Sequence, residues 1–450
     1  MGISQRVQSG HILRLYSSDS DSPSSYAPSK FSHRANLLPN GLGFDLKEET
    51  GWYTTWVISQ STKLPSHIYN IFHTDHEHCS PGSHWALFTR TFLRVAECTV
   101  QNSSITIDQI IGTLLDESIL DPETAEENLN YARYFIFTIL GYQTMLYCPS
   151  PLEPTSGPPG QLRITEDRGC CSYTHASLTQ DIQHCASEPI SELLMGFGVL
   201  LPSKNLCLDD NQNIQHAFQQ EVEVDAKVFN AYALHCIAGI KIKWTDALSC
   251  HLEFNSATKE VSIFRLPSFC QFCLAKYEQG KGKGVLHSCA TTSRLRSQWA
   301  TEEEINHFLV EVLLSYRLLF GQTKRSRVLF RSIDPFLYYA GKPRKIRDHL
   351  LSGLCGTRSR NALMLALQRD DHLAEKEKYY LPEDFPILRY RIFVLQKFSS
   401  NTAPRTWLQL WRDNRNSAHW MTFWAVIIFG GFGSLMALLQ VILQFVQFFV

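Results

Sequence analysis

The chain has 450 residues, of which 44% are hydrophobic, 12% aromatic and 19% charged, and its formal net charge is -1. This composition is ample for a packed core and excludes a disordered tether, and a net charge near zero gives no overall field that would recruit nucleic acid. The 13 cysteines are odd in number and lack a short regular spacing, which suits reduced cytosolic thiols better than a disulfide framework.

The first two predicted regions are residues 1–40 and residues 41–148. Ser17–Lys30 is rich in Ser, Pro and Asp and has few large apolar residues, so residues 1–40 are predicted to form a disordered tail. Residues 41–148 are predicted to be a mixed, helix-rich region. Within it, Trp52–Val57 resembles a strand and Trp85–Val95 resembles a helix.

Two further helices are predicted before the first strong breaker. Thr106 and Gln109 form a capping-box pattern ahead of apolar residues with helical spacing, and Ala125–Tyr147 reads as a longer, buried helix that ends before Pro149. Residues 149–163 contain a density of prolines that no regular element tolerates. We therefore expect a Pro-rich linker there, and a domain boundary.

Residues 164–410 are predicted to be an α+β region. Apolar residues alternate with polar ones from Leu248 to Phe254, and a second alternating pair, Val261 and Ile263, follows a polar turn. This pattern indicates a β-hairpin. A second capping box, Thr301 with Glu304, begins a helix whose apolar period lasts until Gly321. The fold class is therefore α+β, mainly helical, with a hairpin and a single C-terminal transmembrane helix.

Three clusters contain metal-ligand residue types. Cys270 and Cys273, followed by His287 and Cys289, could hold a tetrahedral zinc ion, but their apolar flanks make buried structural cysteines the simpler interpretation. The other two clusters lack a recognised ligand spacing: they are His73, His76, His78 and Cys79, and Cys170, Cys171, His175, His184 and Cys185. We expect no metal and no cofactor.

Motifs of familiar enzymes are not found in the sequence. Gly280, Gly282 and Gly284 alternate with lysines but match neither a Walker loop nor a dinucleotide turn, and we expect a polar loop there. A nucleophile elbow, a zinc-protease motif and a kinase signature are also missing. The missing motifs favour a non-enzymatic protein, and an enzyme of an unfamiliar class stays an open alternative.

The segment 324–369 is strongly basic, with 11 basic residues against two acidic ones. Close to a membrane, such a segment can lie on anionic lipid, and Arg344, Lys345 and Arg347 are the candidate lipid contacts. The alternative is a solvated face that pairs with acidic parts of the chain such as Asp116–Glu127.

Residues 411–450 are predicted to be a membrane-interface segment followed by an anchor, because Met421–Val450 carries no charged side chain. Basic residues precede the apolar stretch, at Arg405, Arg412 and Arg415, and none follows it. The positive-inside rule then keeps the N-terminal region in the cytosol. We expect a tail-anchored, single-pass protein of an intracellular membrane.

Small and then polar residues recur every three or four positions along one side of the anchor. One interpretation is a packing face for a second copy or a partner membrane helix. The other interpretation is that the last glutamines lie in the far headgroup region and are hydrated, because the helix is longer than the membrane core. The residues of this packing face are Gly430, Gly433, Ala437, Gln440, Gln444 and Gln447.

Five segments together are similar to a family of filamentous-fungal proteins that carry a C-terminal membrane helix and have no assigned activity. The resemblance implies one soluble domain that ends in the anchor, and it implies no reaction and no site residues. The segments are Phe137–Tyr147, Trp244–Asn255, Lys259–Cys270, Leu313–Gln322 and Trp411–Val426.

Two functional hypotheses follow from the sequence. The first is a non-enzymatic, tail-anchored interaction or scaffold protein that binds a protein partner at an intracellular membrane. The second is a membrane-tethered accessory enzyme or tailoring protein of a fungal biosynthetic gene cluster. A pocket with convergent polar groups would favour the second.

Overall fold

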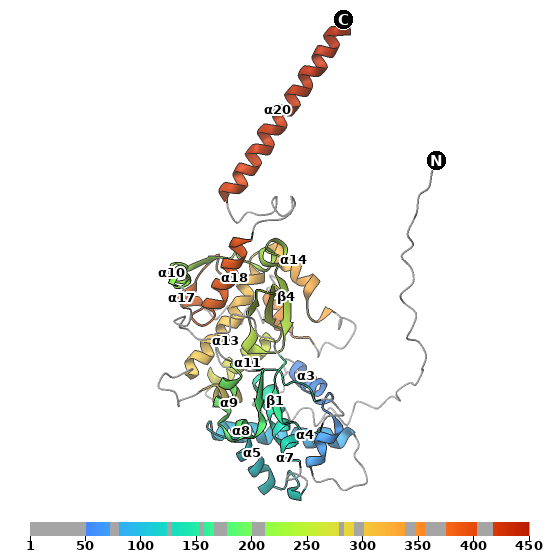
Figure 1. Ribbon diagram of the computed structural model, residues 1–450, viewed down its shortest axis with the longest axis vertical. Coiled ribbons are helices and arrows are strands. Elements are labelled where there is room, and N and C mark those ends of the chain that lie inside the picture. The colour runs from blue at the N-terminus through green and yellow to red at the C-terminus, as the bar shows by residue number, and fades with distance from the viewer. Residues whose placement is uncertain are drawn as a thin grey trace, which may run out of the picture.

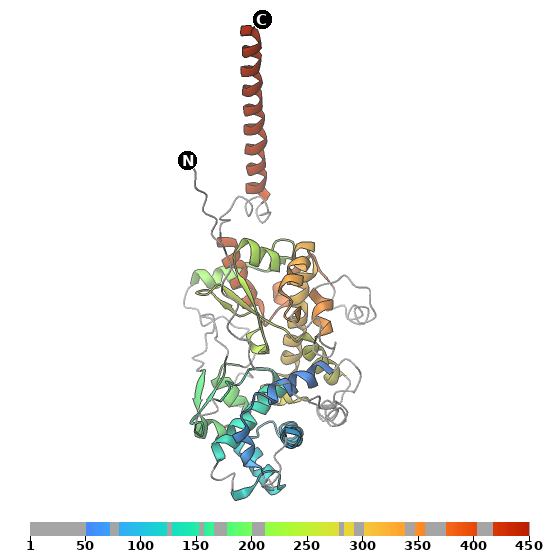
Figure 2. The same cartoon turned by 90° about the vertical axis from the view of Figure 1, so that its right-hand side faces the viewer.

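The computed structural model describes residues 51–72, 81–123, 128–152, 157–165, 178–199, 212–278, 283–291, 301–337, 347–355, 375–402 and 417–449. These residues form a mixed α+β protein that is mainly helical, as predicted, and one long helix stands apart from the globular part (Figures 1 and 2). The predicted tail of residues 1–40 lies outside the described residues.

The main helices of the globular part are α3 (Gly51–Ser61), α4 (Pro81–Gln101), α5 (Ile107–Asp116), α7 (Leu129–Thr144), α8 (Ile182–Ser187), α9 (Ile190–Gly196), α10 (Gln212–Gln220), α11 (Pro267–Glu278), α12 (Val285–Ala290), α13 (Glu302–Tyr316), α14 (Lys324–Ile333), α15 (His349–Cys355), α17 (Leu381–Asp384) and α18 (Arg389–Asn401). Short irregular helices are η2 (Ser66–Ile71), η3 (Ala233–Ile237), η4 (Leu248–Cys250) and η5 (Arg317–Gly321). The strands are β1 (Gln161–Arg163), β2 (Thr179–Asp181), β3 (Glu223–Asp225), β4 (Lys241–Thr245), β5 (Phe254–Asn255), β6 (Glu260–Phe264) and β7 (Lys378–Tyr380).

The described residues of the first region are mainly helical. The strand expected over Trp52–Val57 is wrong because these residues lie in α3. Trp52, Tyr53 and Val57 are buried, at a spacing that suits one face of a helix as well as a short apolar strand. The helix expected at Trp85–Val95 is confirmed as part of α4.

The helix predicted from the first capping box is confirmed as α5. The Thr106 side chain accepts the backbone N–H of Gln109, and the Gln109 side chain accepts the backbone N–H of Thr106. This reciprocal pair satisfies two donors that the first turn leaves without a partner.

Helix α7 is the buried helix of the first region, as predicted. It ends at Met145, whose left-handed backbone lets its N–H reach the Gly141 carbonyl. A side chain at Gly141 would meet the ring of Pro149, where the Pro-rich segment begins, and the ring of Tyr147. The sequence therefore needs glycine here because the chain folds back tightly on its own helix.

The predicted hairpin is present but shorter than expected. Strand β5 pairs antiparallel with β6, and β6 also pairs in parallel with β4, which gives the order β4-β6-β5. The residues from Leu248 to Cys250, expected to start the first strand, form the turn η4 instead. Leu252 then takes a left-handed backbone (φ 59°), which breaks the alternation just before β5.

Helix α13 runs through the centre of the second region and confirms the second capping box, Thr301 with Glu304. Its predicted extension to Gly321 is helical but widens into the π-helical turn η5. Helix α13 packs on α11, and η5 packs on α14 and α15. The apolar core continues without a break from the first region into the second, and α12 contacts α4, α7 and α9 as well as α13. The domain limits drawn at the Pro-rich segment stay a prediction.

A buried polar network ties α13, η4 and α18 together. Neutral His251 accepts the Phe264 N–H at Nδ1 (3.2 Å), and its Nε2 lies 2.7 Å from Ser315 Oγ on α13. Burial and the neighbouring Arg391 guanidinium lower the pKa of His251 to about 3. Arg391 on α18 in turn donates to the Ser249 carbonyl (2.8 Å) and the His251 carbonyl (2.5 Å).

The last described helix is α20 (Ser417–Phe449). Its segment Met421–Gln447 is long and apolar enough to cross a membrane, with a mean hydropathy of 2.3, and its most apolar stretch is not buried against the rest of the chain. Figures 1 and 2 show it extending away from the globular part.

We expect Gly141→Ala to lower the free energy of unfolding by about 1–3 kcal/mol, because the new methyl group would lie within 3 Å of the Pro149 and Tyr147 rings. Gly112→Ala in α5 is the matched control, since nothing lies within 4 Å of its added carbon. That control should be neutral or stabilising by up to about 1 kcal/mol. Urea unfolding in mild detergent measures both, and equal stability of the two variants would contradict this reading of the helix end.

His251 should make the protein less stable in acid. In the unfolded chain it takes up a proton near pH 6.5, whereas in the folded chain it stays neutral down to about pH 3. The unfolded state therefore binds the proton first as the pH falls. The free energy of unfolding should drop through this window by up to about 1.4 kcal/mol per pH unit from this group.

Unfolding of the wild type, His251→Gln and His184→Gln should be followed at about pH 7 and about pH 5. His184 is exposed on α8 and serves as the control. The pH dependence should shrink in His251→Gln only. If all three proteins lose stability equally, His251 does not carry the effect.

Candidate functional site

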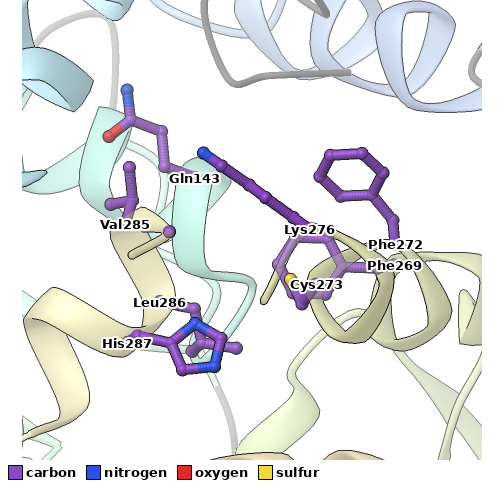
Figure 3. Close-up of a pocket in the computed structure, with 9 residues that line it drawn as sticks. Gln143, Phe269, Phe272, Cys273, Lys276, Val285, Leu286 and His287 are labelled. Atoms are coloured by element: carbon purple, nitrogen blue, oxygen red, sulfur yellow. The ribbon is translucent and has the colours of Figure 1, made fainter. Parts of the chain in front are cut away.

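The candidate site is a small pocket between α7, α11 and α12, with a volume of about 30 Å³ (Figure 3). Its walls are mostly apolar, formed by Phe269, Phe272, Val285 and Leu286. Pro267 begins α11, and Gly284 is the N-terminal cap residue of α12, so each helix starts at a residue suited to that place. The two short helices bring side chains from either end of the 279–282 segment to the same pocket.

Lys276 is the charged group of the pocket. It lies on α11 and is partly buried. Figure 3 shows its side chain reaching across the pocket, with the amine end beside Gln143 of α7. Burial lowers the pKa of Lys276, while the nearby Cys273 opposes that shift. More of this amine is therefore neutral at a given pH than on an exposed lysine.

His287 lies at the floor of the pocket and is only 1% exposed. Its Nε2 is 3.0 Å from Asn306 Oδ1, and its ring stacks on Tyr277 with 5.4 Å between the centroids. Because Oδ1 accepts, Nε2 carries the hydrogen and Nδ1 keeps a lone pair. Burial lowers the pKa of His287, against the hydrogen bond to Asn306, so the ring is held neutral.

Two buried polar atoms in this pocket have no hydrogen-bond partner among the described residues. They are His287 Nδ1 and Gln143 Oε1. The Gln143 amide nitrogen is occupied, since it donates to the Phe92 carbonyl of α4 (2.6 Å). The pocket thus offers an acceptor at each of these atoms and a donor at Lys276.

Cys273 also lines the pocket, one helical turn before Lys276. Burial raises the pKa of the Cys273 thiol to about 12, against the pull of the Lys276 charge. The thiol is therefore protonated at neutral pH and is a weak nucleophile.

The four-residue zinc candidate is only half assembled. Cys273 and His287 share the pocket, whereas Cys270 and Cys289 are fully buried and do not line it. Among the described residues, no three His, Cys, Asp or Glu side chains are grouped as a metal site would need. The free, buried Cys270 and Cys289 agree with the simpler interpretation of structural cysteines.

The other two ligand-rich clusters fall largely outside the described residues. His73, His76, His78 and Cys79 lie outside them, as do Cys170, Cys171 and His175 and the glycines at 280 and 282. His184 and Cys185 are on α8, where the Cys185 thiol donates to Gln180 Oε1 (2.8 Å). That contact is a local structural bond within the β2–α8 corner.

The predicted packing face lies on α20, where its six residues are exposed. Nothing in the described chain lies within 4 Å of a carbon added at Gly430 or Gly433. This side of the helix is therefore open to a neighbour, and the packing role of Gly430, Gly433, Ala437, Gln440, Gln444 and Gln447 stays a prediction.

The predicted lipid contacts also stay a prediction. Arg344 and Lys345 lie outside the described residues, and Arg347 is 2.6 Å from Asp334 and hydrogen bonds to Ser352. The structure places a different basic group on one helix, namely the exposed Lys324, Arg325 and Arg331 of α14. A helical period applied to 324–333 could have found that face.

Lys276 is the site residue that the sequence analysis missed. Its signal is the spacing of three from Cys273, which places the two side chains on one side of the helix Pro267–Glu278. No family model, curated protein or solved structure matches the chain.

Proposed function

We propose that the protein is held in an intracellular membrane by α20 and acts there as an interaction protein, with its globular part in the cytosol. The observation that carries the proposal is the exposure of α20, whose most apolar stretch has no part of the chain packed on it. A helix so apolar is costly in water, whereas in a bilayer its backbone is satisfied internally and its side chains meet hydrocarbon.

The orientation rests on charge. The basic residues Arg405, Arg412 and Arg415 precede the apolar stretch, and Met421–Val450 itself has no charged side chain. Short basic segments stay on the cytosolic side of a membrane. The globular part, which precedes these arginines, is then cytosolic.

The size of the pocket argues against turnover of an ordinary-sized metabolite at this place. Small-molecule sites are typically about 300–1,000 Å³, and the pocket on α11 has a volume of about 30 Å³. Such a pocket holds about two water-sized groups.

Insertion tests the anchor. Leu435→Arg combined with Leu438→Arg should raise the free energy of insertion by about 6–8 kcal/mol and release the protein from membranes. Val100→Arg with Leu178→Arg is the matched control, since both residues are exposed apolar side chains of the globular part. Carbonate extraction followed by flotation measures the bound fraction. Anchoring by α20 is wrong if the α20 variant stays in the membrane like the control.

A membrane-tethered enzyme is the second candidate, and the observation that favours it is the placement of Lys276 beside His287 in an apolar pocket. A partly desolvated amine can attack a small carbonyl compound. The nitrogen lone pair forms the new bond to carbon, the carbonyl oxygen leaves as water, and an imine remains. His287 Nδ1 is the nearby group that could accept and return a proton.

Reductive trapping tests this candidate. The full-length protein is treated with acetaldehyde and borohydride, which reduces an imine to a stable secondary amine, and modified lysines are mapped by mass spectrometry. Lys276 should be modified at a lower pH than the exposed Lys63, because more of its amine is neutral. His287→Gln should slow the reaction at Lys276 alone. Modification of Lys276 no faster than that of Lys63 removes the support for an enzyme.

A further inference from the structure

We propose that the outward face of α14 docks on anionic lipid headgroups of the membrane that α20 enters. We define this basic face as Lys324, Arg325, Val328 and Arg331. The inference rests on the proposed anchor, and it adds the surface and the chemical class of lipid that the globular part meets.

The orientation of α14 is fixed by its buried side. Phe330 packs edge-on against Trp244 of β4 and against Phe320 of η5, with ring centroids 6.1 and 5.7 Å apart. Ser326 is also buried and hydrogen bonds to Asn230 (3.0 Å). With these two residues turned inward, the helical period turns positions 324, 328 and 331 outward, and all four residues of the basic face are exposed.

The charge of the basic face is available to a partner. Elsewhere the exposed cations often pair with carboxylates, as in Lys227 with Glu377 and Lys376 with Asp384. Among the described residues, no carboxylate forms an ion pair with Lys324, Arg325 or Arg331, and the Arg325 guanidinium lies 5.4 Å from the ring centre of Tyr232. Three clustered positive charges that no described carboxylate neutralises suit a surface of anionic headgroups.

Two apolar side chains lie on or beside this charged surface. Val328 is 53% exposed in the middle of the basic face, and Leu337, just beyond the end of α14, is 46% exposed. Basic residues around an exposed apolar group are typical of helices that lie in the membrane interface.

The position of α14 agrees with this partner. Figures 1 and 2 both place α14 at the end of the globular part nearest to α20. Residues 402–416 connect α18 to α20 and span at most about 50 Å. Once α20 is inserted, the basic face is confined close to the bilayer, so a contact too weak to hold a free protein becomes populated.

Photocrosslinking of the full-length protein tests the docking. The protein is reconstituted into phosphatidylcholine liposomes with and without phosphatidylserine, with benzoylphenylalanine in place of Val328. Lipid adducts identified by mass spectrometry should form in the phosphatidylserine liposomes and fall several-fold in phosphatidylcholine alone or at high salt. The same probe in place of Val100, an exposed valine on α4 at the other end of the globular part, should give few adducts with either lipid.

Charge reversal gives a second readout. Lys324→Glu, Arg325→Glu and Arg331→Glu together should reduce the adducts at position 328 at least about fivefold. The matched control is Lys63→Glu, Arg90→Glu and Arg163→Glu, which changes three exposed basic residues on other elements. Circular dichroism checks that both variants are folded.

The outcomes separate this inference from the anchor. A protein that does not float with the liposomes contradicts the proposed anchor. A protein that floats but gives equal adducts in both lipids, or crosslinks at position 328 to a second copy, overturns the docking of α14 and leaves the anchor standing.

Discussion

The second half of the fold depends on buried and half-buried charged groups that hydrogen bond across it. Glu311 of α13, 2% exposed, accepts the backbone N–H groups of Ile387 (3.0 Å) and Leu388 (2.6 Å) at the start of α18. Arg391, one turn later, donates to two backbone carbonyls and to Glu253 (3.0 Å). A buried charge is tolerated only when it is paired in this way. These contacts fix α18 against α13 and the η4 turn, and the sheet and α14 are built around that frame.

The sequence predicted those elements whose signals are local. The two capping boxes, at Thr106 and at Thr301, were found because the residues that start a helix lie three positions apart and interact with each other. The apolar run of α20 is equally local. The short apolar run Trp52–Val57 fits both the strand and the helix period, and packing of residues such as the buried Tyr53 on the rest of the chain favours the helix.

Long-range contacts account for what the sequence could not predict. The alternation from Leu248 to Phe254 resembles a strand, but the η4 turn forms where Ser249 donates to the Leu146 carbonyl (2.5 Å), across more than a hundred residues. The pocket has the same origin, because Gln143 of α7 and Lys276 of α11 line it together although they are far apart in the chain. The sequence placed Cys273 and His287 in one candidate group, and the structure gives them a common pocket without the other two ligands.

The attachment of α18 determines which contacts of the globular part bear a force that is applied through α20. A force applied through α20 enters the globular part at Thr402 and Asn401, and α18 is the first element to resist it. The resistance comes from Arg391 bonds to residues some 140 positions earlier in the chain. These bonds connect α18 to the η4 turn and to Glu253, so such a force acts on residues far from the end of the globular part. Any displacement of α20 relative to the globular part would therefore act first on α18 and, through Arg391, on the η4 turn and Glu253.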